Sequence, residues 1–80
     1  MYDRARAHFL SRSYPAATED CTAMLRLIPG AAEAYLLRGQ ASEAAGDPAA
    51  ALSDLREARR LDPKMYRAAR ADWPTLPENP

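Results

Sequence analysis

The chain repeats itself at an interval of 34 residues. When residues 1–29 are laid over residues 35–63, eight positions carry the same residue. The matches are Arg4/Arg38, Ala7/Ala41, Ala16/Ala50, Ala17/Ala51, Asp20/Asp54, Arg26/Arg60, Leu27/Leu61 and Pro29/Pro63. Alanine matches arise easily in this sequence, but those of aspartate, Arg-Leu and proline do not. Self-similarity at such a period indicates a stack of two equivalent structural units.

The residue types available make each unit helical. Alanine occurs 18 times and leucine nine times, whereas valine is absent and Ile28 is the single isoleucine. Alanine and leucine are strong helix formers, and strands depend on the β-branched residues that are missing here. The sequence therefore predicts an all-α fold.

Proline and glycine divide the chain into short segments. We expect helices near 2–12, 15–28, 31–45, 48–61 and 65–72. Ser13 and Asp47 are candidate N-caps, because Pro15 and Pro48 follow them where a helix tolerates proline. Loops of a few residues between such helices are typical of antiparallel hairpins.

A helical hairpin repeated every 34 residues resembles the tetratricopeptide repeat family. The second copy carries most of the family pattern, in Tyr35, Arg38-Gly39, Ala51, Leu55, Ala58 and Leu61-Asp62-Pro63. The first copy is weaker, and His8 and Ser42 stand where the family usually has tyrosine. The resemblance implies an α-solenoid built from antiparallel helix hairpins.

The 80 residues leave room for a single small domain. We expect a helical domain over 1–72, made of repeat one (1–30), repeat two (31–64) and a capping helix (65–72), followed by a proline-rich tail (73–80). Met65, Ala69 and Trp73 are spaced to form one stripe on that capping helix. The alternative is that Trp73 begins a flexible tail.

Small residues are expected where the two helices of a hairpin meet. Gly39 and Ala51 should face each other in the second unit, as Ala5 and Ala17 should in the first, because larger side chains would force the helix axes apart. Leu52, Leu55 and Leu61 are expected to supply buried apolar area.

The resemblance also places a binding groove along the first helix of each hairpin. The expected ligand-binding residues are Tyr2, Arg6, Phe9, Glu33, Leu36, Gln40, Glu43, Arg67 and Arg70. Arginines beside aromatic side chains suit a peptide that carries a carboxylate and a hydrophobic group. The alternative is that Tyr2, Phe9 and Leu36 simply pack in the core while the charged groups are solvated.

Catalytic and metal chemistry have few candidate residues. His8 is the single histidine and Cys21 the single cysteine, so a dyad would need these two in contact with no third group to orient His8. Both are expected on inward helix positions, where core packing is the simpler role. One histidine and one cysteine do not complete a metal site, and the sequence suggests neither an enzyme nor a cofactor.

Charge and cysteine content indicate which partners and which cellular compartment to expect. Lysine plus arginine and aspartate plus glutamate are both 11, and no apolar run is long enough to cross a membrane, so neither nucleic acid nor membrane is an expected partner. A local arginine cluster interleaves with Asp54, Glu57 and Asp62, which favours an ion-paired face over an RNA site. A single cysteine suits a reducing compartment such as the cytoplasm.

These observations predict a non-catalytic protein–protein interaction module whose groove accepts a peptide or a partner helix of unknown identity. The alternative is structural. The chain would then be the C-terminal end of a longer array, or it would self-associate edge to edge through its N-terminal face.

Overall fold

The computed structural model of this chain describes residues 2–71, most of which lie in five α-helices. The helices are α1 (Tyr2–Leu10), α2 (Tyr14–Leu27), α3 (Ala32–Ala44), α4 (Pro48–Leu61) and α5 (Pro63–Ala71). Within this described part of the chain no residue lies in a strand, which confirms the all-α prediction. Trp73 and the proline-rich tail lie outside the described residues.

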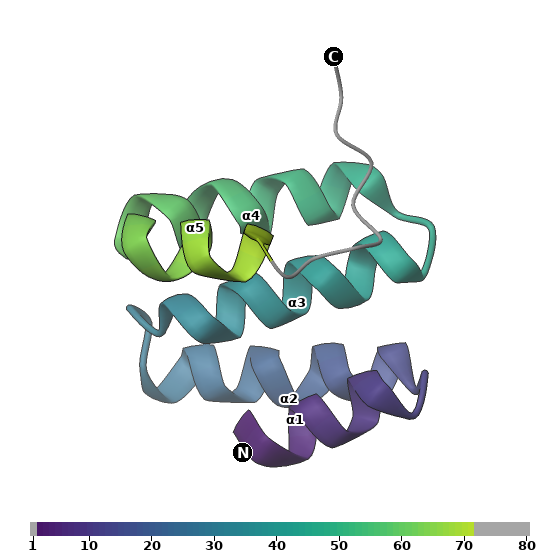
Figure 1. Ribbon diagram of the computed structural model, residues 1–80. Helices are drawn as coiled ribbons and strands as arrows, with labels where there is room; N and C mark the ends of the chain where they lie inside the picture. The colour runs from purple at the N-terminus through teal and green to yellow at the C-terminus, as the bar shows by residue number, and fades with distance from the viewer. Residues whose placement is uncertain (1, 72–80) are drawn as a thin grey trace.

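The helices form two antiparallel hairpins, α1–α2 and α3–α4, with α5 against the second (Figure 1). The hairpins are stacked so that α3 packs on α2 and also reaches α1. In Figure 1, α1 and α5 both lie on the side toward the viewer, with α3 between them. One face of the molecule is therefore built from α1, α3 and α5, which hold equivalent places in the stack.

The two hairpin turns have the same hydrogen bonding but different residues at the position with a positive φ angle. After α3, the amide of Gly46 donates to Glu43 and that of Asp47 donates to Ser42, with Gly46 at φ 89°. After α1, the amide of Arg12 donates to Phe9 and that of Ser13 donates to His8, with Arg12 at φ 63°. This left-handed turn closes a helix without strain when glycine occupies it, so the first hairpin uses a less favourable residue there.

Aspartate rather than serine caps the helices. The Asp47 carboxylate accepts a hydrogen bond from the amide of Ala50, as expected for an N-cap, whereas Ser13 forms no side-chain cap. Asp62 repeats the Asp47 arrangement by accepting from the amide of Met65. Because Asp62 caps the chain here, α5 begins at Pro63 instead of the predicted residue 65, with proline in the first turn where it is tolerated.

Small residues allow the helices of each hairpin to approach closely, as the sequence predicted. Ala5, Ala17 and Ala51 are each at most 1% exposed. A Cβ atom added to Gly39 would lie 2.8 Å from a methyl carbon of Leu55 and 3.3 Å from the carbonyl oxygen of Ala51. Gly39 therefore lies where α3 touches α4 without room for a side chain.

The prediction that Leu52 lies in the core was wrong, because this side chain is 51% exposed. The buried stripe of α4 is Ala51, Leu55 and Ala58, at the spacing of one helix face. Leu52 follows Ala51 by one residue, which turns it roughly 100° away from that stripe. Leu55 is buried as expected, and Leu61 is half-buried.

An arginine–aspartate pair joins the two helices in each hairpin. Arg38 of α3 donates from Nε and Nη2 to both carboxylate oxygens of Asp54 on α4, at 2.8 Å each. Arg4 of α1 makes the same two-point contact with Asp20 of α2, at 2.9 and 2.8 Å. The hydrogen bonds from Arg4 lower the pKa of Asp20, although burial opposes the shift. The two pairs are 34 residues apart and account for two of the matches between the copies.

The two pairs differ in how far they are withdrawn from water. The Arg38 side chain is 24% exposed, whereas that of Arg4 is 68% exposed. Arg38 also donates from Nη1 to Oγ1 of Thr22 on α2, at 3.2 Å, and its guanidinium lies 5.5 Å from the ring centre of Tyr35. Arg38 thus joins α3 to α4 within the second hairpin. Through Thr22 it also joins the second hairpin to the first.

Replacing Gly39 with leucine should lower the free energy of unfolding by about 1–3 kcal/mol, because the new side chain would overlap Leu55. Gly30→Leu is the matched control: a Cβ at Gly30 meets nothing within 4 Å, so we expect a change within about 0.5 kcal/mol. Urea unfolding followed by circular dichroism measures both. Equal stabilities for the two variants would contradict the close-approach model.

Asp54→Asn should lower the free energy of unfolding by about 2 kcal/mol, because it leaves the half-buried Arg38 guanidinium without its counter-charge. Asp20→Asn in the first hairpin should cost less, because water can solvate the exposed Arg4. Chemical denaturation of both variants gives the comparison. A loss at Asp20 equal to or larger than that at Asp54 would show that exposure does not decide the strength of these pairs.

Candidate functional site

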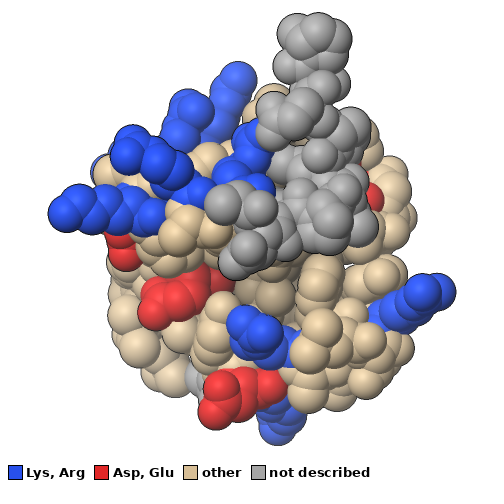
Figure 2. All heavy atoms as spheres, in the orientation of Figure 1, with Lys and Arg blue, Asp and Glu red and all other residues tan. Residues whose placement is uncertain are grey.

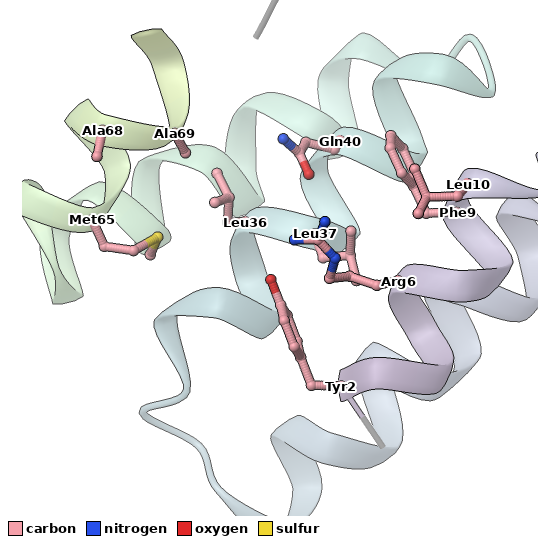
Figure 3. Close-up of a pocket in the computed structure, with 10 residues that line it drawn as sticks. All are labelled: Tyr2, Arg6, Phe9, Leu10, Leu36, Leu37, Gln40, Met65, Ala68 and Ala69. Carbon is pink, nitrogen blue, oxygen red and sulfur yellow. The ribbon is translucent and has the colours of Figure 1, made fainter. Parts of the chain in front are cut away.

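A hollow of about 510 Å³ opens on the face formed by α1, α3 and α5 (Figure 3). Its lining residues come from all three helices: Tyr2, Arg6, Phe9, Leu10, Leu36, Leu37, Gln40, Met65, Ala68 and Ala69. In Figure 3 the side chains of Tyr2 and Arg6 extend from α1 toward α3, with those of α5 on the opposite side of the opening. We call this feature the α1–α3–α5 hollow.

The floor of the hollow is apolar and part of the folded core. Leu36 and Leu37 of α3 are 6% and 3% exposed, and they belong to the two core clusters of the molecule. Tyr2 and Phe9 pack against the first cluster and Met65 against the second, each half-buried. These side chains therefore contribute to packing and also present apolar surface to the opening.

Two polar side chains stand among these apolar ones. Arg6 is exposed and is the one charged residue in the described lining of the hollow, and it forms no ion pair within residues 2–71. Gln40 is half-buried on α3. A guanidinium provides fixed donors for a carboxylate or carbonyl, and a primary amide both donates and accepts.

The structure brings five of the nine expected site residues together in this hollow: Tyr2, Arg6, Phe9, Leu36 and Gln40. Glu33 and Glu43 lie on α3 but do not line it. Arg67 and Arg70 do not line it either, and instead border a second hollow with Arg59, Pro63 and Tyr66.

The rotation of α5 explains why its arginines face elsewhere. Met65, Ala68 and Ala69 occupy the side of α5 toward the α1–α3–α5 hollow, and Tyr66, Arg67 and Arg70 border the other one. Met65 and Ala69 already formed an apolar stripe in the sequence, and this was the signal that could have identified the correct face. The sequence predicts a capping role for this stripe and does not place Met65 and Ala69 in the lining of the hollow.

Cys21 is in the core, as expected, and its thiol is not activated. The residue is 1% exposed, and burial raises the pKa of the Cys21 thiol to about 11. His8 is half-buried, and its Nε2 lies 3.7 Å from a carboxylate oxygen of Asp20 on α2. The geometry therefore gives the thiol neither a depressed pKa nor access to solvent, the two properties of a reactive cysteine.

Within residues 2–71, no three histidine, cysteine, aspartate or glutamate side chains are grouped so that they could hold a metal ion. No helix in this range combines the length and the apolar character needed to span a membrane.

Comparison with known proteins agrees with the geometry. Residues 32–65 match the family model of the tetratricopeptide repeat, and this segment contains the α3–α4 hairpin with its glycine–alanine contact. This segment is therefore a tetratricopeptide repeat. Proteins of this family generally mediate protein–protein interactions and are not catalysts. Searches of curated proteins and of solved structures give no match to the chain.

Cys21 should react slowly with Ellman's reagent in the folded protein at pH 8. A thiol pKa near 11 reduces the thiolate fraction roughly 100-fold relative to an ordinary thiol, and burial slows access further. Reaction rates with and without denaturing urea measure the effect. A folded-state rate equal to the unfolded rate would show that Cys21 is accessible.

Proposed function

We propose that this chain binds an extended peptide of a partner protein in the α1–α3–α5 hollow. The observation that carries the proposal is that three equivalent helices combine apolar surface at one opening with an exposed arginine, Arg6, that forms no ion pair within residues 2–71. Stacked helices support such a surface because each packs against a neighbouring helix.

The chemistry of the lining defines the kind of peptide. Tyr2, Phe9 and Met65 offer half-buried apolar contacts for one bulky hydrophobic side chain of the ligand. Arg6 would donate to a carboxylate or main-chain carbonyl beside that side chain, and Gln40 would pair with a main-chain amide. The ligand is therefore a segment with a large apolar residue next to an acidic one.

The structural alternative receives less support from the outer face of α1. In the register of the repeat, Asp3 is equivalent to Leu37, which is 3% exposed and packs on the first hairpin. Asp3 is exposed, and the neighbouring Arg4 is turned to Asp20. This face offers charge where a stacked repeat offers leucine, so it does not favour edge-to-edge association.

Ala68→Glu should weaken peptide binding while leaving the fold intact. Ala68 is exposed, lines the hollow and lies on a helix, so the change adds a charge to the opening without touching the core. Leu36 is a poorer site for this test, because a glutamate at a 6% exposed position would test folding instead. The probes are peptides selected on the wild-type chain from a random phage-displayed library.

Ala49→Glu provides the matched control, since Ala49 is an exposed helical alanine that does not line the hollow. Fluorescence anisotropy should show a loss of roughly tenfold or more with Ala68→Glu and little change with Ala49→Glu. Equal binding by both variants, or failure to select any peptide, would reject this placement. Sedimentation of the wild-type chain addresses the structural alternative, and a monomer at high concentration would count against self-association.

A further inference from the structure

The second hollow, of about 240 Å³, lies where the end of α4 meets α5 and is dominated by arginine. Its lining consists of Arg59, Pro63, Tyr66, Arg67 and Arg70. Arg59 comes from the last turn of α4 and the other residues from α5, so two helices converge on the same small opening. We call it the α4–α5 hollow.

The charge around this hollow is concentrated although the whole chain is neutral. Residues 56–70 contain six lysines or arginines against two acidic residues, whereas residues 1–55 contain five against seven. Figure 2 shows basic side chains gathered over the end of the molecule that carries α5 and the close of α4. The zero net charge therefore results from a basic segment at 56–70 that is balanced by an acidic surplus in the rest of the sequence.

The acidic residues that interleave with these arginines in sequence do not neutralise the α4–α5 hollow. Asp54 is directed to Arg38 on α3, and Glu57 pairs with Arg60. Asp62 accepts a hydrogen bond from the amide of Met65 as the cap of α5. The side chains of Arg59 and Arg67 form no ion pair within residues 2–71, so the expectation of an ion-paired face holds for Arg60 but not for these two.

Tyr66 positions one of the arginines at this hollow. Nη1 of Arg70 donates to the Tyr66 hydroxyl at 3.2 Å, and the Arg70 guanidinium lies 5.9 Å from the ring centre of Tyr66. These contacts keep the positive charge of Arg70 at the edge of the hollow, beside Arg59 and Arg67. The hollow thus combines two exposed arginines with a third whose orientation is restrained.

We infer that the α4–α5 hollow binds an oxyanion side chain of a partner peptide, either a carboxylate or a phosphate ester. The exposed guanidinium groups of Arg59 and Arg67 supply planar, paired donors that match the oxygens of both groups. The site lies on the opposite side of α5 from the α1–α3–α5 hollow, and the inference does not depend on the peptide site proposed there.

A peptide fits the surroundings better than a nucleic acid does. The opening is small, and the acidic surplus of residues 1–55 would repel a long polyanion that extended beyond α4 and α5. The one aromatic ring in its lining, Tyr66, is already occupied by Arg70, so it is not available as a platform for stacked bases. A short acidic segment would meet the arginines without crossing the negative region.

The test uses the complete 80-residue chain and two fluorescein-labelled probes: hexaglutamate, and a serine-glycine peptide containing one phosphoserine. The unphosphorylated serine-glycine peptide is the reference for the second probe. Arg59→Gln/Arg67→Gln removes two charges from the hollow, and Arg12→Gln/Arg26→Gln removes two exposed charges elsewhere. Fluorescence anisotropy gives the affinities, and amide chemical shifts locate the contact.

We expect at least one probe to shift the amides of residues 59–70 and to lose roughly tenfold in affinity with Arg59→Gln/Arg67→Gln only. The probe that binds identifies the carboxylate or the phosphate as the source of the oxyanion. Equal losses in the two double variants would show bulk charge attraction and overturn the site. Tighter, salt-sensitive binding of single-stranded RNA at the same amides would overturn the choice of a peptide. Ala68→Glu should bind the same probe with the affinity of the wild-type chain. A failure of the α4–α5 site can then be distinguished from a failure of the peptide site in the α1–α3–α5 hollow.

Discussion

The Arg38–Asp54 pair is the interaction on which the arrangement of the hairpins most depends. Two parallel hydrogen bonds fix the rotation of α3 against α4, and the third nitrogen of Arg38 reaches Thr22 on α2. A half-buried guanidinium must find partners in both neighbours, because leaving it unpaired away from water is costly. The exposed Arg4–Asp20 pair repeats the contact within the first hairpin, where water can share in solvating the arginine.

That fixed rotation determines what the molecule presents to solvent. With Arg38 turned to Asp54, α3 directs Leu36 and Gln40 to the opening between α1 and α5, and Leu36 also packs with Leu55 of α4. The apolar floor of the α1–α3–α5 hollow is therefore continuous with the core. Leu36 and Leu37 are buried and belong to the core as well as to the opening, whereas Arg6 and Ala68 are exposed and lie at the opening.

The two sides of α5 carry different kinds of side chain and border different hollows. Its Met65–Ala69 side continues the apolar surface of α3, and its Tyr66–Arg70 side forms a basic surface with the end of α4. A chain with no net charge can therefore present an apolar and a cationic site on the two sides of one short helix. Use of both would require a partner that reaches around α5, or two partners.

The sequence by itself determined the helical class, the two-hairpin organisation and the tetratricopeptide repeat at residues 32–65, because alanine content, proline placement and the 34-residue period depend on local spacing. It also predicted five residues of the α1–α3–α5 hollow, since α1 and α3 keep the register of the repeat. The rotation of α5 about its axis could not be predicted from the sequence. Asp62 caps this helix so that it begins at Pro63, two residues before the predicted start, and packing against α4 decides which of its side chains face each hollow. Packing of α4 against α3 likewise decided that Leu52 is exposed. The same packing pairs Asp54 with Arg38 across the hairpin and not with Arg56, which lies close to it in sequence.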